Sequence, residues 1–454
     1  MKPPARSLDL NSLCDPLSLK ASGSADVSFL WEEKWASLAP LGTTVFLESA
    51  GETTETGRWC FLAGHPRAEI WGRGGRIEGT SPGMIQDIPD DLDSFLDFIA
   101  GRKNVSTSFP NFLAQAWFGA FSYESGVPGF RATDEKPEFY FFRPGKIWAL
   151  DRLMSQWMEW GSGPETFSTP IGSFRVEDFR AERKPEDYGR WVERAKDYIA
   201  QGDIYQANLA QKFTAHWEGD PFSLYQTLRQ FNPGPFMGIL KTPLFTLVSS
   251  SPERLIRGEA GILETRPIAG TRPRGKEQAE DSRLKRELQS HPKELAEHLM
   301  LVDLARNDLG RVARYGSVEV KNFAQVESYA RVHHLVSRVE ARASDGASFS
   351  KIFRSVFPGG TITGCPKIRC MQIIQELEQE PRHFYTGSLG YVAPGLVFDF
   401  NILIRSFTLW PDGGLEFSAG AGIVSDSEPD REYMETLHKA EALARTLGTS
   451  LVPA

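Results

Sequence analysis

The stretch HPKELAEHLMLVDLARND, residues 291–308, predicts one long helix in the second half of the chain. Pro292 stands in the first turn, where a helix tolerates proline, and neither glycine nor proline follows until Gly310. With about 3.6 residues per turn, Leu295, Leu299 and Val302 fall on one face. We therefore expect this apolar face to be buried.

Two acidic residues and a histidine share the neighbouring face of this helix. Glu294, Glu297 and His298 are spaced i, i+3 and i+4, which brings their side chains together. Glu432 and Glu435 repeat the acidic spacing near the other end of the chain. Four carboxylates on two helices could hold Mg²⁺, which favours oxygen ligands together with substrate oxygens. A solvated acidic face is the plain alternative, and the sequence does not show that the two helices meet.

Composition is that of an ordinary globular protein. The chain has 454 residues, of which 41% are hydrophobic and 24% charged, enough for a large core. A net charge of −8 argues against nucleic acid or an anionic membrane as the main partner. The four cysteines form no CxxC pair, and no stretch approaches about 18 apolar residues. We expect a reduced, cytoplasmic protein without membrane spans.

Strand-like segments alternate irregularly with helices, which predicts an α+β fold rather than repeated βαβ units. Apolar and aromatic runs typical of strands lie at 43–49, 57–64, 116–124 and 138–150. Helices are predicted at 90–100, 185–202, near 350–357 and at 428–446. Segment 71–90 reads as turns, and the polar segment 166–186 as a soft boundary between two regions.

Two glycine-rich turns and one arginine could bind anions. GGTITGCPK (359–367) puts glycines before a predicted helix, where backbone N–H groups bind anions, although a plain capped turn looks the same. SAGAGIV (418–424) could let a carboxylate approach bare backbone, or be a structural bulge. Arg405 ends the apolar run NILIR, a position that suits a bidentate carboxylate partner. His298 and His334 are candidate proton carriers, although a single histidine is more often structural.

A series of blocks in fixed order resembles the signature of the chorismate-utilising enzymes, a family that includes anthranilate, aminodeoxychorismate, isochorismate and salicylate synthases. The blocks are ETRPIAGTRPRG, AEHLMLVDLARNDLGRV, YARVHHLVSRV, FPGGTITGCPKIRCMQII, GSLGY, DFNILIR and AGAGIVSDSEPDREYMETLHKA. The resemblance implies an α/β sandwich of two packed antiparallel sheets flanked by helices. It also implies that an N-terminal region, 1–170, packs intimately against a catalytic region, 185–454.

The resemblance further assigns roles to residues of this chain. Mg²⁺ would be held by four carboxylates, those of Glu294, Glu297, Glu432 and Glu435. Glu253, in SSPERL, would be the general acid that expels the 4-hydroxyl of chorismate, with His298, His334 and Thr271 around the ring. The substrate carboxylates would meet Gly360, Thr361, Tyr391, Arg405, Gly420, Ala421, Gly422 and Lys439.

Two positions bear on the nucleophile. Gln206 stands where the water-using members carry a lysine that activates water, and since glutamine is no base, ammonia is the expected nucleophile. Ala269 stands in PIAGT, where many aminodeoxychorismate synthases have PIKGT and use the lysine covalently. Alanine is the anthranilate synthase residue, although some aminodeoxychorismate synthases share it.

Three other positions favour aminodeoxychorismate synthase. Asn208, Thr363 and Ser388 match the pattern of that group, whereas anthranilate synthases more often have valine, serine and alanine there. We therefore expect amination of chorismate to 4-amino-4-deoxychorismate for p-aminobenzoate and folate synthesis. The alternative is anthranilate formation for tryptophan synthesis, and a non-catalytic sensor is disfavoured because the predicted site is complete.

The resemblance also implies partners. The chain encodes no glutaminase, because Cys365 lies inside the signature block and is followed by proline, so a separate glutamine amidotransferase subunit would supply ammonia. Glu48 and Ser49 match the LES element that binds tryptophan in anthranilate synthases. We expect a tryptophan pocket there, whether inhibitory or structural.

Overall fold

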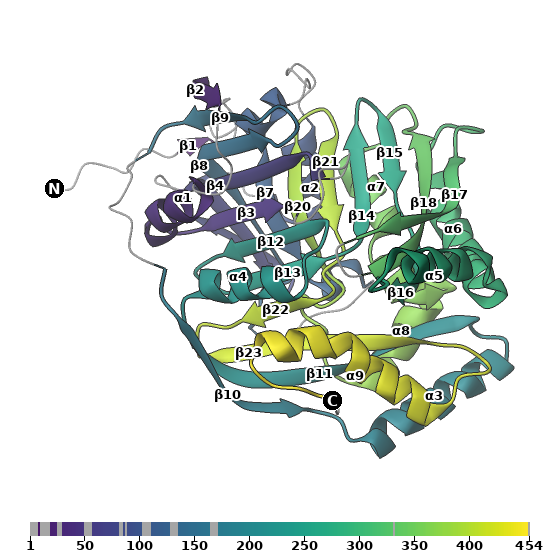
Figure 1. The fold of residues 1–454 in the computed structure, drawn as a ribbon. Helices are drawn as coiled ribbons and strands as arrows, with labels where there is room; N and C mark the ends of the chain where they lie inside the picture. Colours follow the sequence, from purple (N-terminus) through teal and green to yellow (C-terminus); the bar gives the residue numbers. More distant parts are fainter. Residues whose placement is uncertain are drawn as a thin grey trace.

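The protein is described by a computed structural model (Figure 1). It covers residues 31–49, 57–80, 89–101, 110–127, 135–163, 171–329 and 332–452, with the backbone at 8–9, 19–24, 30 and 85–86. The helices are α1 (Leu30–Leu38), α2 (Leu92–Ala100), α3 (Pro185–Ala200), α4 (Pro221–Phe231), α5 (Gln278–Ser290), α6 (Pro292–Gly310), α7 (Phe349–Val356), α8 (Lys367–Glu378) and α9 (Pro429–Thr446).

The strands of the first half of the chain are β1 (Leu8–Asp9), β2 (Leu19–Ser24), β3 (Thr44–Glu48), β4 (Trp59–Arg73), β5 (Arg76–Thr80), β6 (Ile85–Gln86), β7 (Trp117–Phe121), β8 (Phe139–Asp151), β9 (Gln156–Gly161), β10 (Phe174–Ala181) and β11 (Gln206–Gly219). Those of the second half are β12 (Phe236–Lys241), β13 (Thr246–Ser251), β14 (Arg254–Glu259), β15 (Ile262–Thr265), β16 (Ile268–Pro273), β17 (Glu319–Ser328), β18 (Val332–Arg342), β19 (Gly364–Cys365), β20 (Ser388–Ala393), β21 (Val397–Asn401), β22 (Ser406–Leu409) and β23 (Gly414–Ile423).

Antiparallel pairing joins most strands into one network. The hydrogen-bonded path runs β10–β11–β23–β22–β13–β12–β3–β4–β8–β7–β20–β21–β14–β15–β18, and both β16 and β17 pair with β18. The path folds back on itself to give two packed layers, because β4 and β8 are long enough to pass from one layer into the other. A register shift in β4 between Pro66 and Ala68 marks the bend.

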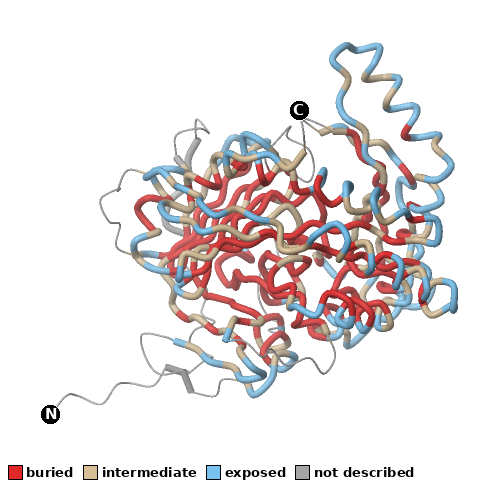
Figure 2. Tube along the Cα trace, turned by 90° about the horizontal axis from the view of Figure 1, so that it is seen from below, coloured by how far each residue is buried: buried red, intermediate tan, exposed pale blue. Residues whose placement is uncertain are grey.

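Alternation along the strands distributes side chains between separate cores. On β3, Val45 enters the core between the two layers, while its neighbour Phe46 packs beneath α1, α4 and α9. A third core packs α2, α6 and α7 on the outer face of the second layer, and α3 with α8 covers β11 and β23. Figure 2 shows the buried residues gathered through the interior. The mixture of helices with a large antiparallel sheet confirms the α+β prediction.

Two segments depart from the sequence prediction. Residues 71–90 were predicted to be turns, which is wrong for the β4–β5 hairpin, whose turn is Gly74–Gly75, both with positive φ. This hairpin lies at an edge, so its charged, exposed side chains give no apolar alternation. The polar segment before α3 contains β10, in which Asp178 has φ of +54° and a register shift follows Glu177, so the bulge breaks the period of two.

Helix α6 buries Val302 as predicted, but it exposes Leu299 and buries the neighbouring side that carries His298. Leu299 is 56% exposed, whereas His298 is fully buried together with Leu301, Val302 and Leu309. The helix packs against β16 and β18. The imidazole ring of His298 therefore lies on the buried side of the helix, where an apolar side chain would be expected. Within the described residues, no helix combines the length and apolar character needed to cross a membrane.

Leu240→Ala tests the core between the two layers. Leu240 on β12 is fully buried there, so the truncation should lower the free energy of unfolding by about 2–5 kcal/mol. Leu153→Ala is the matched control, because that side chain is 56% exposed and should change the value by less than about 0.5 kcal/mol. Equal losses in urea denaturation would contradict this assignment of the core.

Candidate active site

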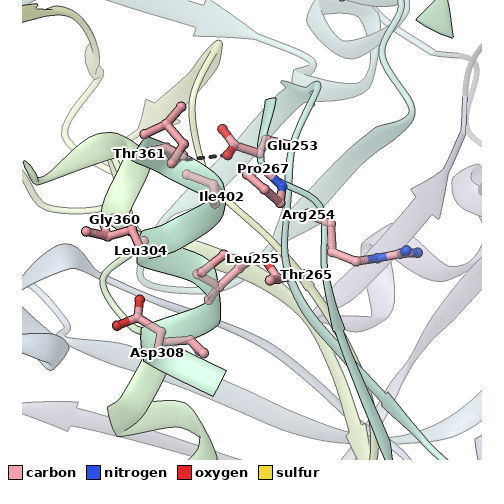
Figure 3. A pocket seen from close by; sticks show the side chains of 14 residues that line it. Glu253, Arg254, Leu255, Thr265, Pro267, Leu304, Asp308, Gly360, Thr361 and Ile402 are labelled. Atoms are coloured by element: carbon pink, nitrogen blue, oxygen red, sulfur yellow. Dashed lines mark hydrogen bonds between the residues drawn. The ribbon is translucent and has the colours of Figure 1, made fainter. Parts of the chain in front are cut away.

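A pocket lies where the start of β14, helix α6 and the glycine-rich 3₁₀ turn η6 (Gly360–Ile362) meet (Figure 3). Glu253 is buried in its wall, and its Oε1 accepts a hydrogen bond from the Thr361 hydroxyl at 2.9 Å. The pocket is otherwise mostly apolar and is lined by Arg254, Leu255, Thr265, Pro267, Leu301, Leu304, Ala305, Asp308, Val356, Gly359, Gly360 and Ile402. A Cβ at Gly360 would lie 2.0 Å from Leu304 Cδ2, so a larger residue there would displace the Leu304 side chain.

Burial controls the protonation of Glu253. Desolvation raises the pKa of its carboxyl to about 8, although the Thr361 hydrogen bond and the positive charge of Arg405 both oppose the rise. A carboxyl group with this pKa carries its proton at neutral pH. It can therefore donate a proton to a leaving oxygen.

Arg405 supplies a positive charge that no described residue neutralises by contact. It follows β21 with φ of +53°, a conformation that non-glycine residues rarely adopt. Burial lowers the pKa of its guanidinium, and the negative charge of Glu253 partly offsets this fall. Among the described residues its guanidinium makes no hydrogen bond or ion pair, so it is available to a carboxylate of a ligand.

Two of the predicted site residues, His334 and His298, carry neutral imidazoles. Burial, and then the charge of Arg405, lower the pKa of His334 to about 4. His334 Nδ1 lies 3.2 Å from the Gly270 carbonyl and 3.0 Å from Thr271 Oγ1. Because a carbonyl only accepts, we assign the proton to Nδ1, which leaves Nε2 as an acceptor.

His298 is neutral for the same reason, since burial lowers its pKa to about 4. Its Nε2 lies 2.6 Å from Ser337 Oγ, and that oxygen already accepts the Ala324 N–H. The remaining nitrogen, Nδ1, is buried without a partner in the described chain. An unpartnered buried polar atom of this kind suits a bound ligand.

The paired strands β11 and β23 carry a second group of predicted site residues. A Cβ on Gly422 would lie 2.4 Å from Gln206 Nε2, and one on Gly420 would lie 2.8 Å from Asn208 Nδ2. Gln206 Oε1 is buried and lacks a partner within the described residues, and the buried Asn208 amide lies beside the Tyr385 hydroxyl. Lys439 Nζ donates to the Gly420 carbonyl at 3.0 Å. The two glycines thus leave room for amide groups and for a ligand above them.

The four predicted metal ligands lie on α6 and α9, whose N-terminal ends are linked by a 3.0 Å ion pair between Lys293 and Asp426. Desolvation and repulsion from neighbouring carboxylates raise the carboxyl pKa of Glu297 and Glu432. Glu294 and Glu435 are instead neutralised within the chain.

Magnesium fits the chemistry of this acidic pair of helices. All four groups are hard oxygen donors, and a divalent cation would relieve the repulsion that raises the pKa of Glu297. Glu294 contacts Arg272 at 3.0 Å and Glu435 contacts Lys439 at 2.7 Å. In the described ranges no three His, Cys, Asp or Glu side chains already converge on one point. Binding would therefore require these side chains to exchange partners.

Tyr391 does not line this pocket. Its ring packs between the layers against Phe112, with centroids 5.4 Å apart, because Leu389, Tyr391 and Ala393 alternate onto one core face. Ala421 also turns its side chain away, into the core beside α3, and offers only its backbone. Ala269 is buried opposite Leu335 and two residues before Thr271.

Tyr391 instead borders a second cavity, which is lined in part by the two residues predicted to bind tryptophan. Glu48 and Ser49 line it with Trp59, Phe236, Met237, Arg254, Asp399 and Asn401 among others. Glu48 is buried and accepts hydrogen bonds from Tyr225 Oη at 2.5 Å and Arg229 Nε at 2.7 Å. The LES element is thus held rigidly at the mouth of an amphipathic cavity.

Tyr385 is the site residue that sequence reasoning missed. Its hydroxyl lies 3.0 Å from the position that a Cβ on Gly420 would occupy, on the same side as Asn208. Burial raises the pKa of this hydroxyl to about 12, so it remains a hydrogen-bond donor. The sequence contains a signal for this difference, because Leu389, Tyr391 and Ala393 alternate along a strand and so predict a core position for Tyr391. Tyr385 is the preceding tyrosine, outside that alternation.

Comparison with known proteins gives one consistent family. A family model described as chorismate binding enzyme matches residues 44–445. Aminodeoxychorismate synthase component 1 of Bacillus subtilis is 39% identical over 438 residues, covering 89% of this chain and 92% of that protein. Anthranilate synthase component 1 of Aquifex aeolicus is 47% identical over 270 residues, covering 60% and 54%.

A solved structure supports the same relationship. The crystal structure of anthranilate synthase component I from Streptococcus pneumoniae superposes with a TM-score of 0.74 at 30% identity, covering 86% of this chain and 92% of that one. The residues matched by the family model include Glu253, Gln206 and Arg405. This chain belongs to the family of chorismate binding enzymes.

Proposed function

We propose that this protein is component I of an aminodeoxychorismate synthase, which aminates chorismate with ammonia to give 4-amino-4-deoxychorismate. The supporting observation is the similarity to the Bacillus subtilis synthase, which extends over 89% of the chain. The wall formed by β11 agrees with amination, because Gln206 and Asn208 present amides and no base for water.

Glu253 would deliver the proton that the reaction needs. The C4–O bond of chorismate breaks as its hydroxyl takes the Glu253 proton and leaves as water. Ammonia then forms the new C–N bond and loses a proton to solvent. Residue 269 is alanine and has no nucleophilic atom, so the amine must reach the ring without a covalent adduct at that position.

Charged groups on opposite walls would orient the substrate. Arg405 would hold one carboxylate, with the Tyr385 hydroxyl and the backbone near Gly420 beside it. Magnesium, held by Glu297 and Glu435 with Glu294 and Glu432 close by, would neutralise the other carboxylate. The neutral imidazoles of His298 and His334 would accept or donate hydrogen bonds without adding charge.

Ammonia would come from a separate glutaminase chain. The relatives are named as component 1, which supports a second component. The cavity beside Glu48 would accept tryptophan, because it combines aromatic walls with a fixed carboxylate.

Anthranilate formation is the second candidate, and two observations favour it. Ala269 is the residue of the direct C2 amination pattern, and the Aquifex aeolicus anthranilate synthase is 47% identical over 270 residues. The pocket geometry is compatible with either product, because both begin with loss of the 4-hydroxyl.

Product analysis separates the two candidates. Purified protein with chorismate, Mg²⁺ and ammonium should yield p-aminobenzoate only when aminodeoxychorismate lyase is added, because the proposed product retains its enolpyruvyl group. Reaction without protein is the control. Fluorescent anthranilate formed without the lyase would overturn the proposal in favour of the second candidate.

The proton on Glu253 predicts the pH dependence. Activity requires the protonated carboxyl, so kcat/KM at constant free ammonia should fall about tenfold per unit as pH rises above the pKa of about 8. Thr361→Val removes a hydrogen bond that favours the ionised form, so it should move this limb to higher pH. An unmoved limb would show that another group is the acid.

Glu297→Gln tests the metal ligands. Loss of this carboxylate should weaken Mg²⁺ binding, measured by calorimetry, by at least about 100-fold. Mg²⁺-dependent turnover should fall by a similar factor. Asp303→Asn, on the same helix with a 69% exposed side chain, is the matched control and should change neither. Wild-type Mg²⁺ affinity in the Glu297 variant would refute the assignment.

A further inference from the structure

We propose that Arg382 is a positioning residue that fixes the substrate-facing segments relative to one another, with Glu378 as its counter-charge. Arg382 lies in the connection between α8 and β20 and is 5% exposed. The inference rests on chorismate being the substrate but not on which amination product is formed.

The guanidinium of Arg382 bridges strand β11 and the turn η6, two segments that carry predicted site residues. Its Nη2 donates to the Asn208 carbonyl on β11 at 2.7 Å, and its Nη1 donates to the Ile362 carbonyl at the end of η6 at 3.1 Å. Asn208 lies two residues from Gln206, and Ile362 directly follows Thr361, the partner of Glu253. One side chain thus couples the wall beside the nucleophile to the wall beside the acid.

Glu378, at the end of α8, completes the link to β11. Its two carboxylate oxygens accept from Arg382 Nη2 at 2.6 Å and Nε at 2.8 Å. Oε1 also accepts the Ala210 N–H at 2.9 Å. The pair therefore bonds β11 at the carbonyl of Asn208 and at the amide of Ala210, which fixes this strand against sliding or rotation.

A third segment is held by the same group. The guanidinium carbon of Arg382 lies 4.8 Å from the ring centre of Tyr123 and 5.7 Å from that of Tyr385. The Arg382 backbone N–H donates to buried Glu124 Oε1 at 2.7 Å, which anchors the turn itself. Tyr385, whose hydroxyl faces Gly420, is therefore oriented by the Arg382 plane.

Position 382 requires the planar geometry of a guanidinium as well as a positive charge. A guanidinium offers donors in a rigid plane and can serve two carbonyls and a carboxylate at once, which the compact ammonium of lysine cannot span. Arg382→Lys keeps the charge opposite Glu378 but should release one or both carbonyls. A displacement of about 1 Å in a catalytic wall can cost roughly 100-fold in rate.

The experiment compares Arg382→Lys with Arg143→Lys in the full-length protein. Arg143 is an equally buried arginine on β8 that donates to the Ala114 and Ala116 carbonyls at 2.7 and 3.1 Å, remote from Glu253 and Arg405. Chorismate consumption with Mg²⁺ and ammonium gives kcat and KM, and the thermal midpoint reports folding. Glu378→Gln serves as the second test variant, because it leaves the guanidinium but removes its fixed partner.

The two arginine variants should separate. Arg382→Lys and Glu378→Gln should raise the KM for chorismate at least about tenfold and lower kcat/KM about 100-fold. Arg143→Lys should lower the thermal midpoint while its KM stays at the wild-type value. Wild-type KM in both Arg382→Lys and Glu378→Gln, or an equal rise in Arg143→Lys, would overturn the proposal. Wild-type protein that consumes no chorismate would instead contradict the proposed function.

Discussion

The pairing of β11 with β23 is the constraint on which the site depends. Ten successive register pairs, from Ala207 opposite Ile423 to His216 opposite Gly414, hold the two strands together. This register places Gln206 and Asn208 over glycines, and it brings α9, which follows β23, within reach of α6. A slip by one residue would turn the amides into the core beneath α3 and α8. The chemistry of the pocket is thus a consequence of strand register.

Burial then gives the pocket its protonation states. Removing water raises the pKa of Glu253 and lowers that of His334, so an acid and a neutral imidazole coexist at neutral pH. Arg405 retains a positive charge without a contacting partner in the described chain. These states are costly for an isolated protein, and a dianionic ligand with a divalent cation would offset much of that cost. Electrostatics and family membership lead to the same substrate class.

The sequence predicted most of the secondary-structure elements, and the departures from it have physical causes. A helix over 291–308 was predicted because an unbroken run with proline at its start leaves few alternatives, and the structure has it at Pro292–Gly310. Val302 is buried as predicted but Leu299 is exposed, and His298 is buried because it hydrogen-bonds Ser337, a contact that no sequence pattern reveals. Tyr391 was predicted from the resemblance alone, and alternation along β20 places its ring in the core. The link between Arg382 and Asn208 spans 174 residues and could not have been foreseen locally.

A crystal structure of the Glu253→Gln variant with Mg²⁺ and chorismate is the most direct test of this account. The account predicts the metal between α6 and α9, one substrate carboxylate on Arg405, and the 4-hydroxyl within hydrogen-bond distance of residue 253. Chorismate bound in the cavity beside Glu48, or bound with Arg405 unoccupied and the metal elsewhere, would contradict it.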